Sequence, residues 1–240
     1  MNLKEKNKLI RKVNSLLLKK FGKPYRSEKL PDPVDLLIAT ILSQNTNDAN
    51  SYKAYKSLKE KYPDWKKLLK VPAEKIEKII KIAGLGKQKS GAIKNFITSV
   101  YKEKSDINLN FVKRMDDLSA IKKLTEYKGV GVKTASCVLL FAFDKDVCPV
   151  DTHVHRTVNR IGIVKASSPD KTFFLLNENF PKGIAHSFHT NLIRLGREIC
   201  KPKNPSCGVC PLKQICNFNG KNPENNSQNE SRSFMLLDNV

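Results

Sequence analysis

Residues 124–135 read Leu-Thr-Glu-Tyr-Lys-Gly-Val-Gly-Val-Lys-Thr-Ala, and an apolar run follows them. The short segment Gly129-Val130-Gly131 interrupts two stretches that both have helical patterns, so this region predicts a helix, a tight hairpin and a second helix. Glycine permits positive φ angles and a close approach of the backbone. The second helix should begin near Val132, with unpaired N–H groups that attract a phosphate.

Two ionisable residues mark helix starts on either side of this apolar run. Lys133 lies in the first turn of the second hairpin helix, where the helix dipole disfavours an ammonium group. Asp151 follows the turn Cys148-Pro149-Val150 and can cap a helix that starts at Thr152. Each residue alone has an ordinary interpretation, because a lysine after a glycine hairpin often contacts a phosphate and an aspartate often only caps a helix.

The segments Gly-Val-Gly-Val-Lys-Thr-Ala at 129–135 and Val-Asp-Thr-His-Val at 150–154 together resemble the helix-hairpin-helix DNA glycosylases of the endonuclease III family. The resemblance implies that Lys133 is the nucleophile and Asp151 the second catalytic group. Lys128 stands where the family often has proline. DNA contacts are expected at the hairpin and the start of the helix after it: Lys128, Gly129, Val130, Gly131, Val132 and Thr134.

A polar segment at 42–50, Leu-Ser-Gln-Asn-Thr-Asn-Asp-Ala-Asn, follows an apolar helix. Asp48 can cap the next helix, and a capped loop would explain most of these residues. The segment also resembles the family's loop whose amide side chain fills the gap left by an extruded base. Asn45 matches that amide position, and Gln44 is the neighbouring alternative.

Residues 84–90 read Gly-Leu-Gly-Lys-Gln-Lys-Ser and resemble a half-repeat of the central hairpin. Gln88 falls where Lys133 lies in the other copy, and no Val-Asp-Thr-His follows, so this copy has no candidate nucleophile. Two interpretations stay open. The segment is either a simple helix C-cap or a DNA-facing loop in which Leu85 matches the family's apolar wedge.

Four cysteines lie close together in the spacing Cys200-x6-Cys207-x2-Cys210-x5-Cys216. Crowded thiolates repel one another unless a cation neutralises them, so the spacing predicts a metal centre. Zinc and an iron–sulfur cluster both accept four cysteines. The spacing resembles the 4Fe–4S loop of the endonuclease III family, which favours a 4Fe–4S cluster over the alternative, zinc.

The chain of 240 residues carries 44 Lys and Arg against 23 Asp and Glu, a formal net charge of +21. Such an excess, spread along the chain, favours a polyanionic partner. Together with the resemblance it predicts binding to double-stranded DNA that contains damaged bases or abasic sites. No apolar window is long enough to span a membrane and no signal peptide is present, so we expect an intracellular protein, cytoplasmic or associated with the nucleoid. We also expect a monomer.

No segment alternates with a period of two, so an all-α fold is expected. The resemblance implies two lobes with DNA in the cleft between them: a helical barrel over 34–145, and a C-terminal lobe over 150–218 with which an N-terminal helix in 1–30 packs. Residues 219–240 read as a disordered tail. Helices are expected at 3–21, 34–42, 49–62, 73–82, 87–104, 116–127, from 132 onward, 152–162, 169–179 and 184–198.

The resemblance implies a bifunctional base excision repair enzyme, a DNA N-glycosylase and abasic-site lyase. Damaged bases, oxidised pyrimidines by family default, would be removed through a Schiff base on Lys133, and the strand would be cut by β-elimination. Two alternatives stay open. One is a glycosylase for mismatched thymine or uracil, and the other is a non-catalytic helix-hairpin-helix DNA-binding protein.

Overall fold

Helices and turns make up all the regular structure of residues 1–227, the part of the chain that the computed structural model describes. This confirms the all-α prediction. Within these residues no helix combines the length and apolarity needed to cross a membrane. The described residues divide into two compact units, one formed by Ser27–Lys145 and the other by Met1–Arg26 with the residues from Asp146 onward. We call them the central unit and the terminal unit.

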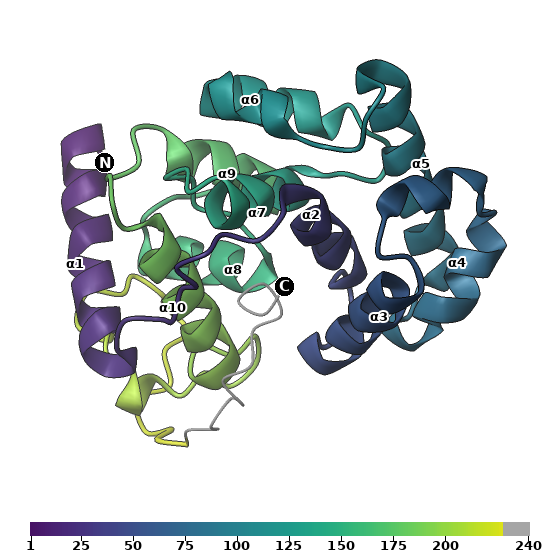
Figure 1. The fold of residues 1–240 in the computed structure, drawn as a ribbon. Helices are drawn as coiled ribbons and strands as arrows, with labels where there is room; N and C mark the ends of the chain where they lie inside the picture. The colour runs from purple at the N-terminus through teal and green to yellow at the C-terminus, as the bar shows by residue number, and fades with distance from the viewer. Residues whose placement is uncertain (228–240) are drawn as a thin grey trace. The chain divides into compact units, whose positions relative to one another are not determined.

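The helices of the two units are shown in Figure 1. The central unit contains α2 (Pro33–Leu42), α3 (Asp48–Lys61), η1 (Trp65–Lys70), α4 (Ala73–Ile80), η2 (Lys81–Ala83), α5 (Gly86–Lys104), η3 (Asn110–Arg114), α6 (Asp117–Thr125) and α7 (Val132–Ala142). The terminal unit contains α1 (Leu3–Phe21), α8 (Thr152–Ile161), α9 (Pro169–Asn177), α10 (Ala185–Glu198) and η4 (Cys207–Val209).

Helix α2 forms the middle of the central unit. Asp32 caps it by accepting hydrogen bonds from the N–H groups of Val34 and Asp35, and Pro33 occupies the first helical position, where a missing N–H costs nothing. From Leu36 to Leu42 every side chain is buried. A helix that is buried all round must be surrounded by others, and α2 packs against α3, α5 and α7.

The central hairpin connects α6 to α7 as the sequence predicts. Gly129 has a φ of +95°, which glycine adopts without strain, and its Cα faces Ala92 of α5 with no room for a side chain. The N–H of Val130 donates to the carbonyl of Tyr127 and closes the turn. Gly131 differs from the expectation, since its φ of −92° is open to any residue and the space beside it is empty.

The N-terminal helix belongs to the terminal unit, where α1 packs against α10 (Figure 1). Its apolar positions Ile10, Val13 and Leu17 are fully buried there. The Lys6 ammonium donates to the carbonyls of Leu175 and Glu178 at the end of α9. One apolar stripe and one lysine thus attach the start of the chain to residues about 170 positions away.

Two local features differ from the sequence prediction. Asn47, and not Asp48, is the N-cap of α3, because its extended backbone lets the side chain accept the N–H of Asn50 at 2.8 Å. The 3-10 helices η1, η3 and η4 were not expected. Within the tail predicted to be disordered, Asn222 and Asn225 donate to Asn204, and the disorder itself stays a prediction. Residues 228–240 lie outside the described residues.

Candidate functional site

Lys133 is the second residue of α7 and its side chain is half-buried. Among residues 1–227, no hydrogen bond or ion pair engages its Nζ atom. The backbone N–H groups of Val132, Lys133 and Thr134 likewise have no acceptor in the described part of the chain, because Gly131 has no side chain to cap the helix. The amine is therefore available for chemistry beside an uncapped helix N-terminus that suits an anion.

The other hairpin residues fall into two groups. Lys128, Gly129 and Gly131 are exposed and Val132 is half-exposed, so they are open to a bound duplex. Val130 and Thr134 have buried side chains, and the Thr134 hydroxyl accepts from Gln44 Nε2 at 3.4 Å. DNA contacts by these two residues are therefore limited to their main-chain atoms.

Asn45 lies in the loop between α2 and α3 and is exposed, with a left-handed φ of 49°. Gln44 is half-buried, and its amide points toward Thr134 of α7. The two amides that the sequence left as alternatives thus have different surroundings. The Asn45 side chain makes no hydrogen bond to any described residue, while Gln44 links its loop to α7.

Leu85 has the same unusual backbone as Asn45, with a φ of 51°, and 48% of its side chain is exposed. A leucine rarely adopts positive φ, and the strain must be balanced by the packing around it. The segment Gly84-Leu85 both ends η2 and begins α5. It is therefore a helix boundary and also an exposed apolar projection, so the two interpretations of the sequence are compatible.

Asp151 is the N-cap of α8 in the terminal unit. Its Oδ1 accepts the N–H of Val154 at 2.7 Å, while in the described part of the chain its Oδ2 accepts no hydrogen bond. Burial lowers the pKa of His153, which the Asp151 carboxylate opposes only in part. His153 is thus a neutral neighbour at neutral pH, and its Nδ1 lies 3.2 Å from an amino group of Arg156.

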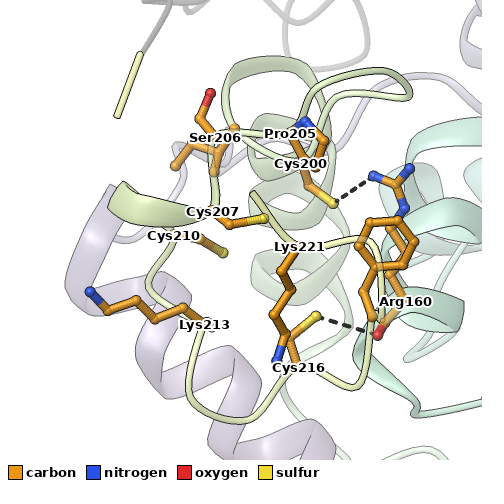
Figure 2. A pocket seen from close by; sticks show the side chains of 11 residues that line it. Arg160, Cys200, Pro205, Ser206, Cys207, Cys210, Lys213, Cys216 and Lys221 are labelled. Carbon is orange, nitrogen blue, oxygen red and sulfur yellow. Dashed lines mark hydrogen bonds between the residues drawn. The ribbon is translucent and has the colours of Figure 1, made fainter. Parts of the chain in front are cut away.

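All four cysteines of the C-terminal motif line one pocket in the terminal unit, as Figure 2 shows. Within residues 1–227, no three metal-binding side chains converge closely enough to hold a single ion. Burial, together with smaller contributions from the other three cysteines, raises the pKa of the Cys210 thiol to about 11. Four thiolates here therefore require a cationic group among them.

Two arginines of α8 hold this cysteine loop, and no sequence motif pointed to either of them. Arg156 donates to the carbonyls of Gly196 and Cys200. Arg160 donates to the carbonyls of Lys201 and Pro202, lies 3.5 Å from Cys200 Sγ, and accepts from the Cys216 thiol through its own carbonyl (Figure 2). The two arginines are four residues apart and therefore lie on one face of α8. This i, i+4 spacing is the sequence feature that could have indicated a shared role.

Residues 38–182 match the model of the HhH-GPD superfamily of base excision DNA repair proteins, and residues 200–216 match the iron–sulfur binding domain of endonuclease III. The chain is 38% identical to the endonuclease III of Thermotoga maritima over 193 residues, which cover 80% of this chain and 86% of the relative. The chain belongs to the endonuclease III family. Its cofactor is accordingly a 4Fe–4S cluster, and the alternative of zinc is set aside.

Solved structures agree with this assignment. An endonuclease III trapped in a covalent intermediate with DNA superposes with a TM-score of 0.74 at 29% identity, over 88% of this chain and 95% of that one. A thermostable thymine-DNA glycosylase superposes with a TM-score of 0.72 at 25% identity, over 88% and 97%. This member of the endonuclease III family is a DNA-binding enzyme of base excision repair with glycosylase and lyase activity.

Cys200, Cys207, Cys210 and Cys216 stay the predicted cluster ligands, and their thiols line one pocket within the matched domain. When bound, the cluster neutralises the thiolates and cross-links a loop whose only regular structure is η4. Arg160 and Arg156 join that loop to α8, the helix that Asp151 begins.

Proposed function

We propose that this enzyme removes oxidised pyrimidines from duplex DNA, with Lys133 as the nucleophile and Asp151 as the carboxylate that assists it. The observation that carries the proposal is that, within residues 1–227, the Lys133 amine and the three N–H groups at the start of α7 have no hydrogen-bond partner. A lysine held for structure would be bonded, as Lys6 and Lys94 are, each to two carbonyl oxygens.

The proposed reaction begins when the damaged nucleotide leaves the stack, a step that costs a few kcal/mol and is least costly at a lesion. Neutral Lys133 Nζ then forms a bond to C1′ while the bond from C1′ to the base breaks, and the base leaves with that electron pair and takes up a proton. The sugar ring opens to give an imine with Lys133. Loss of a proton from C2′ then expels the 3′ phosphate by β-elimination, and water releases the product.

Asp151 has two roles in this proposal. Its Oδ1 caps α8, and its Oδ2 is left to interact with the sugar as positive charge develops there. A carboxylate stabilises such a charge and can also accept the proton that the attacking amine loses. A capping carboxylate with one unused oxygen can do both.

We also propose which groups hold the duplex. The N–H groups at the start of α7, with exposed Lys128 beside them, would bind a backbone phosphate. A side chain on Gly131 would occupy the open space in front of these N–H groups, which accounts for a glycine without positive φ. Asn45 would fill the gap that the extruded nucleotide leaves, and Leu85 would wedge between the neighbouring base pairs. Both side chains are exposed and can therefore reach the duplex.

A second candidate substrate is mismatched thymine or uracil. The similarity to a thymine-DNA glycosylase favours it, since that enzyme and the endonuclease III structure superpose about equally well on this chain. Both substrates require an extruded pyrimidine, and the described residues carry the same candidate nucleophile for either one. We further propose that the enzyme acts as a monomer and is found with the nucleoid.

Borohydride trapping tests the proposed nucleophile, because borohydride reduces the imine to a stable covalent link. Wild-type enzyme should be trapped on duplexes that carry thymine glycol or an abasic site. Lys133→Gln should give no trapped complex and no strand cleavage. Lys122→Gln is the matched control, since it removes an exposed lysine of α6 to which we assign no DNA contact, and it should still be trapped. Trapping of Lys133→Gln at the wild-type level would exclude Lys133.

The same assay separates the two candidate substrates. A duplex with a G·T mismatch is added in parallel, and base release is followed in single turnovers. Release from thymine glycol alone supports the oxidised-pyrimidine proposal, while release from the mismatch alone supports the second candidate.

A further inference from the structure

Lys89 is a buried lysine in the first turn of α5. Only 1% of the residue is exposed, although lysine is normally a surface residue. Its Nζ donates to the carbonyl oxygens of Leu42 and Ala83, both at 2.8 Å. Within residues 1–227 no carboxylate pairs with it, and burial lowers its pKa to about 8. Burial of an amine lowers the stability of the fold, so the position of Lys89 and its two hydrogen bonds indicates a role beyond packing.

The two carbonyls belong to the ends of two different helical segments. Leu42 is the last residue of α2, and its carbonyl is among those that a helix C-terminus leaves unpaired. Ala83 is the last residue of η2. A cation at such carbonyls is favoured by the helix dipole. Lys89 therefore bridges the ends of two helical segments, in addition to their own C-caps Ser43 and Gly84.

Each bridged carbonyl lies just before one of the exposed residues proposed to enter the duplex. Asn45 follows Leu42 by three residues, and Leu85 follows Ala83 by two. Both residues have left-handed backbones, with φ of 49° and 51°. A residue with a left-handed backbone sets the direction of its loop only if the residue before the loop is fixed. Lys89 fixes that residue for both loops, through the carbonyls of Leu42 and Ala83.

We propose that Lys89 is a positioning residue that sets the Asn45 loop and the Leu85 loop in register, so that both side chains reach the same damaged base pair. This inference rests on the proposed function of those two loops. Lys89 touches neither substrate nor reacting atoms. Its removal should therefore disturb base extrusion more than the binding of intact DNA, and more than the stability of the fold.

The chain offers a matched control on the same helix. Lys94 also donates to two carbonyls, those of Leu68 and Leu69, at 2.7 and 2.8 Å. Both of these belong to η1, a single segment from which we propose no DNA contact. Lys89→Met and Lys94→Met thus each remove one lysine with two bonds to carbonyl oxygens, and only the first separates the two loops.

The test uses the full-length, cluster-loaded enzyme and a duplex with a tetrahydrofuran abasic analogue opposite 2-aminopurine, whose fluorescence rises when the base is unstacked. Wild type and Lys94→Met should give the full rise. Lys89→Met should give less than half of it and at least a tenfold lower single-turnover excision rate on thymine glycol. Its affinity for an undamaged duplex and its thermal unfolding temperature should match those of Lys94→Met.

Equal fluorescence rises and excision rates in the two variants would overturn the inference and leave the proposed function intact. If Lys89→Met does not fold, Lys89→Gln takes its place, because its shorter amide cannot reach both carbonyls, and the same comparison applies. If wild type itself gives neither a rise nor excision, the proposed function is wrong and the inference falls with it.

Discussion

Gly129 and Ala92 are in such close contact that a Cβ atom on Gly129 would lie only 3.0 Å from the Cα of Ala92 and would overlap its methyl group. The contact connects the hairpin to α5, the helix that also carries Lys89. The hairpin glycines therefore have separate reasons to be glycine. Gly129 is required by packing and by its positive φ, whereas Gly131 meets neither requirement.

Gly129→Ala should destabilise the protein by about 2–4 kcal/mol, the sum of a left-handed alanine and an overpacked contact. Gly131→Ala should leave stability within about 1 kcal/mol of wild type, because its backbone is unstrained. It should nevertheless weaken duplex binding if the N–H groups hold a phosphate. Urea denaturation and a binding titration measure both effects, and equal stability losses in the two variants would contradict the packing argument.

Asp151→Asn separates capping from catalysis. Asparagine caps helices as well as aspartate, so this variant should unfold within about 0.5 kcal/mol of wild type, whereas Asp151→Ala should lose about 1 kcal/mol. Both should lower the single-turnover excision rate by a factor of about 100 or more, since both remove the carboxylate. Asp116→Asn, at the N-cap of α6, is the control with an unchanged rate. A fully active Asp151→Asn would reduce Asp151 to a cap.

Lys89 predicts a particular pH dependence of stability. Its pKa of about 8 in the fold lies below the ordinary value of 10.5. Between these values the unfolded chain binds the extra proton, so the free energy of unfolding should rise with pH from about 8 to 10.5, by roughly 3 kcal/mol at most. Chemical denaturation at several pH values should show this rise in wild type relative to Lys89→Met. Parallel curves would mean that Lys89 titrates normally.

Removing a cluster ligand should affect the terminal unit alone. Cys216→Ala should abolish visible absorption and make the loop at 200–216 sensitive to protease, because this loop buries few side chains of its own. Cys137→Ala, in the core of α7, should keep the absorption. Limited proteolysis with mass analysis locates the cuts, and early cuts in α2 or α7 of Cys216→Ala would contradict a local effect.

The described part of the tail should protect the cluster loop. Asn225 donates to the Asn204 carbonyl and accepts the N–H of Gly208, and Gly208 has no space for a side chain beside Asn226 and Pro223. Removal of residues 222–240 should speed oxidative bleaching of the cluster several-fold. Removal of residues 228–240 alone is the control and should have little effect. Equal bleaching rates in both truncated chains would show that residues 222–227 give the cluster no protection.

Much of the site was readable from the sequence because its signals are local. The glycine hairpin, the aspartate before α8 and the cysteine spacing each fit within a few residues, and the structure has a hairpin, an N-cap and a shared thiol pocket at these positions. The catalytic roles of Lys133 and Asp151 came from the family resemblance and stay predictions. The different surroundings of the Asn45 and Gln44 amides could be seen only in the fold, since Gln44 bonds to Thr134 of α7, while the choice between the two residues stays a prediction.

The α-helices, the Asp151 cap and the cysteine motif could be predicted from local sequence, because periodicity, capping and backbone preference act between near neighbours. The buried charged side chains could be identified only in the tertiary structure. Lys89 looks like any surface lysine, and its partner Leu42 lies 47 residues away. Arg160 likewise binds Lys201, 41 residues away. Burial of a charge depends on acceptors brought together by folding, and no local pattern in the chain encodes where those acceptors will be.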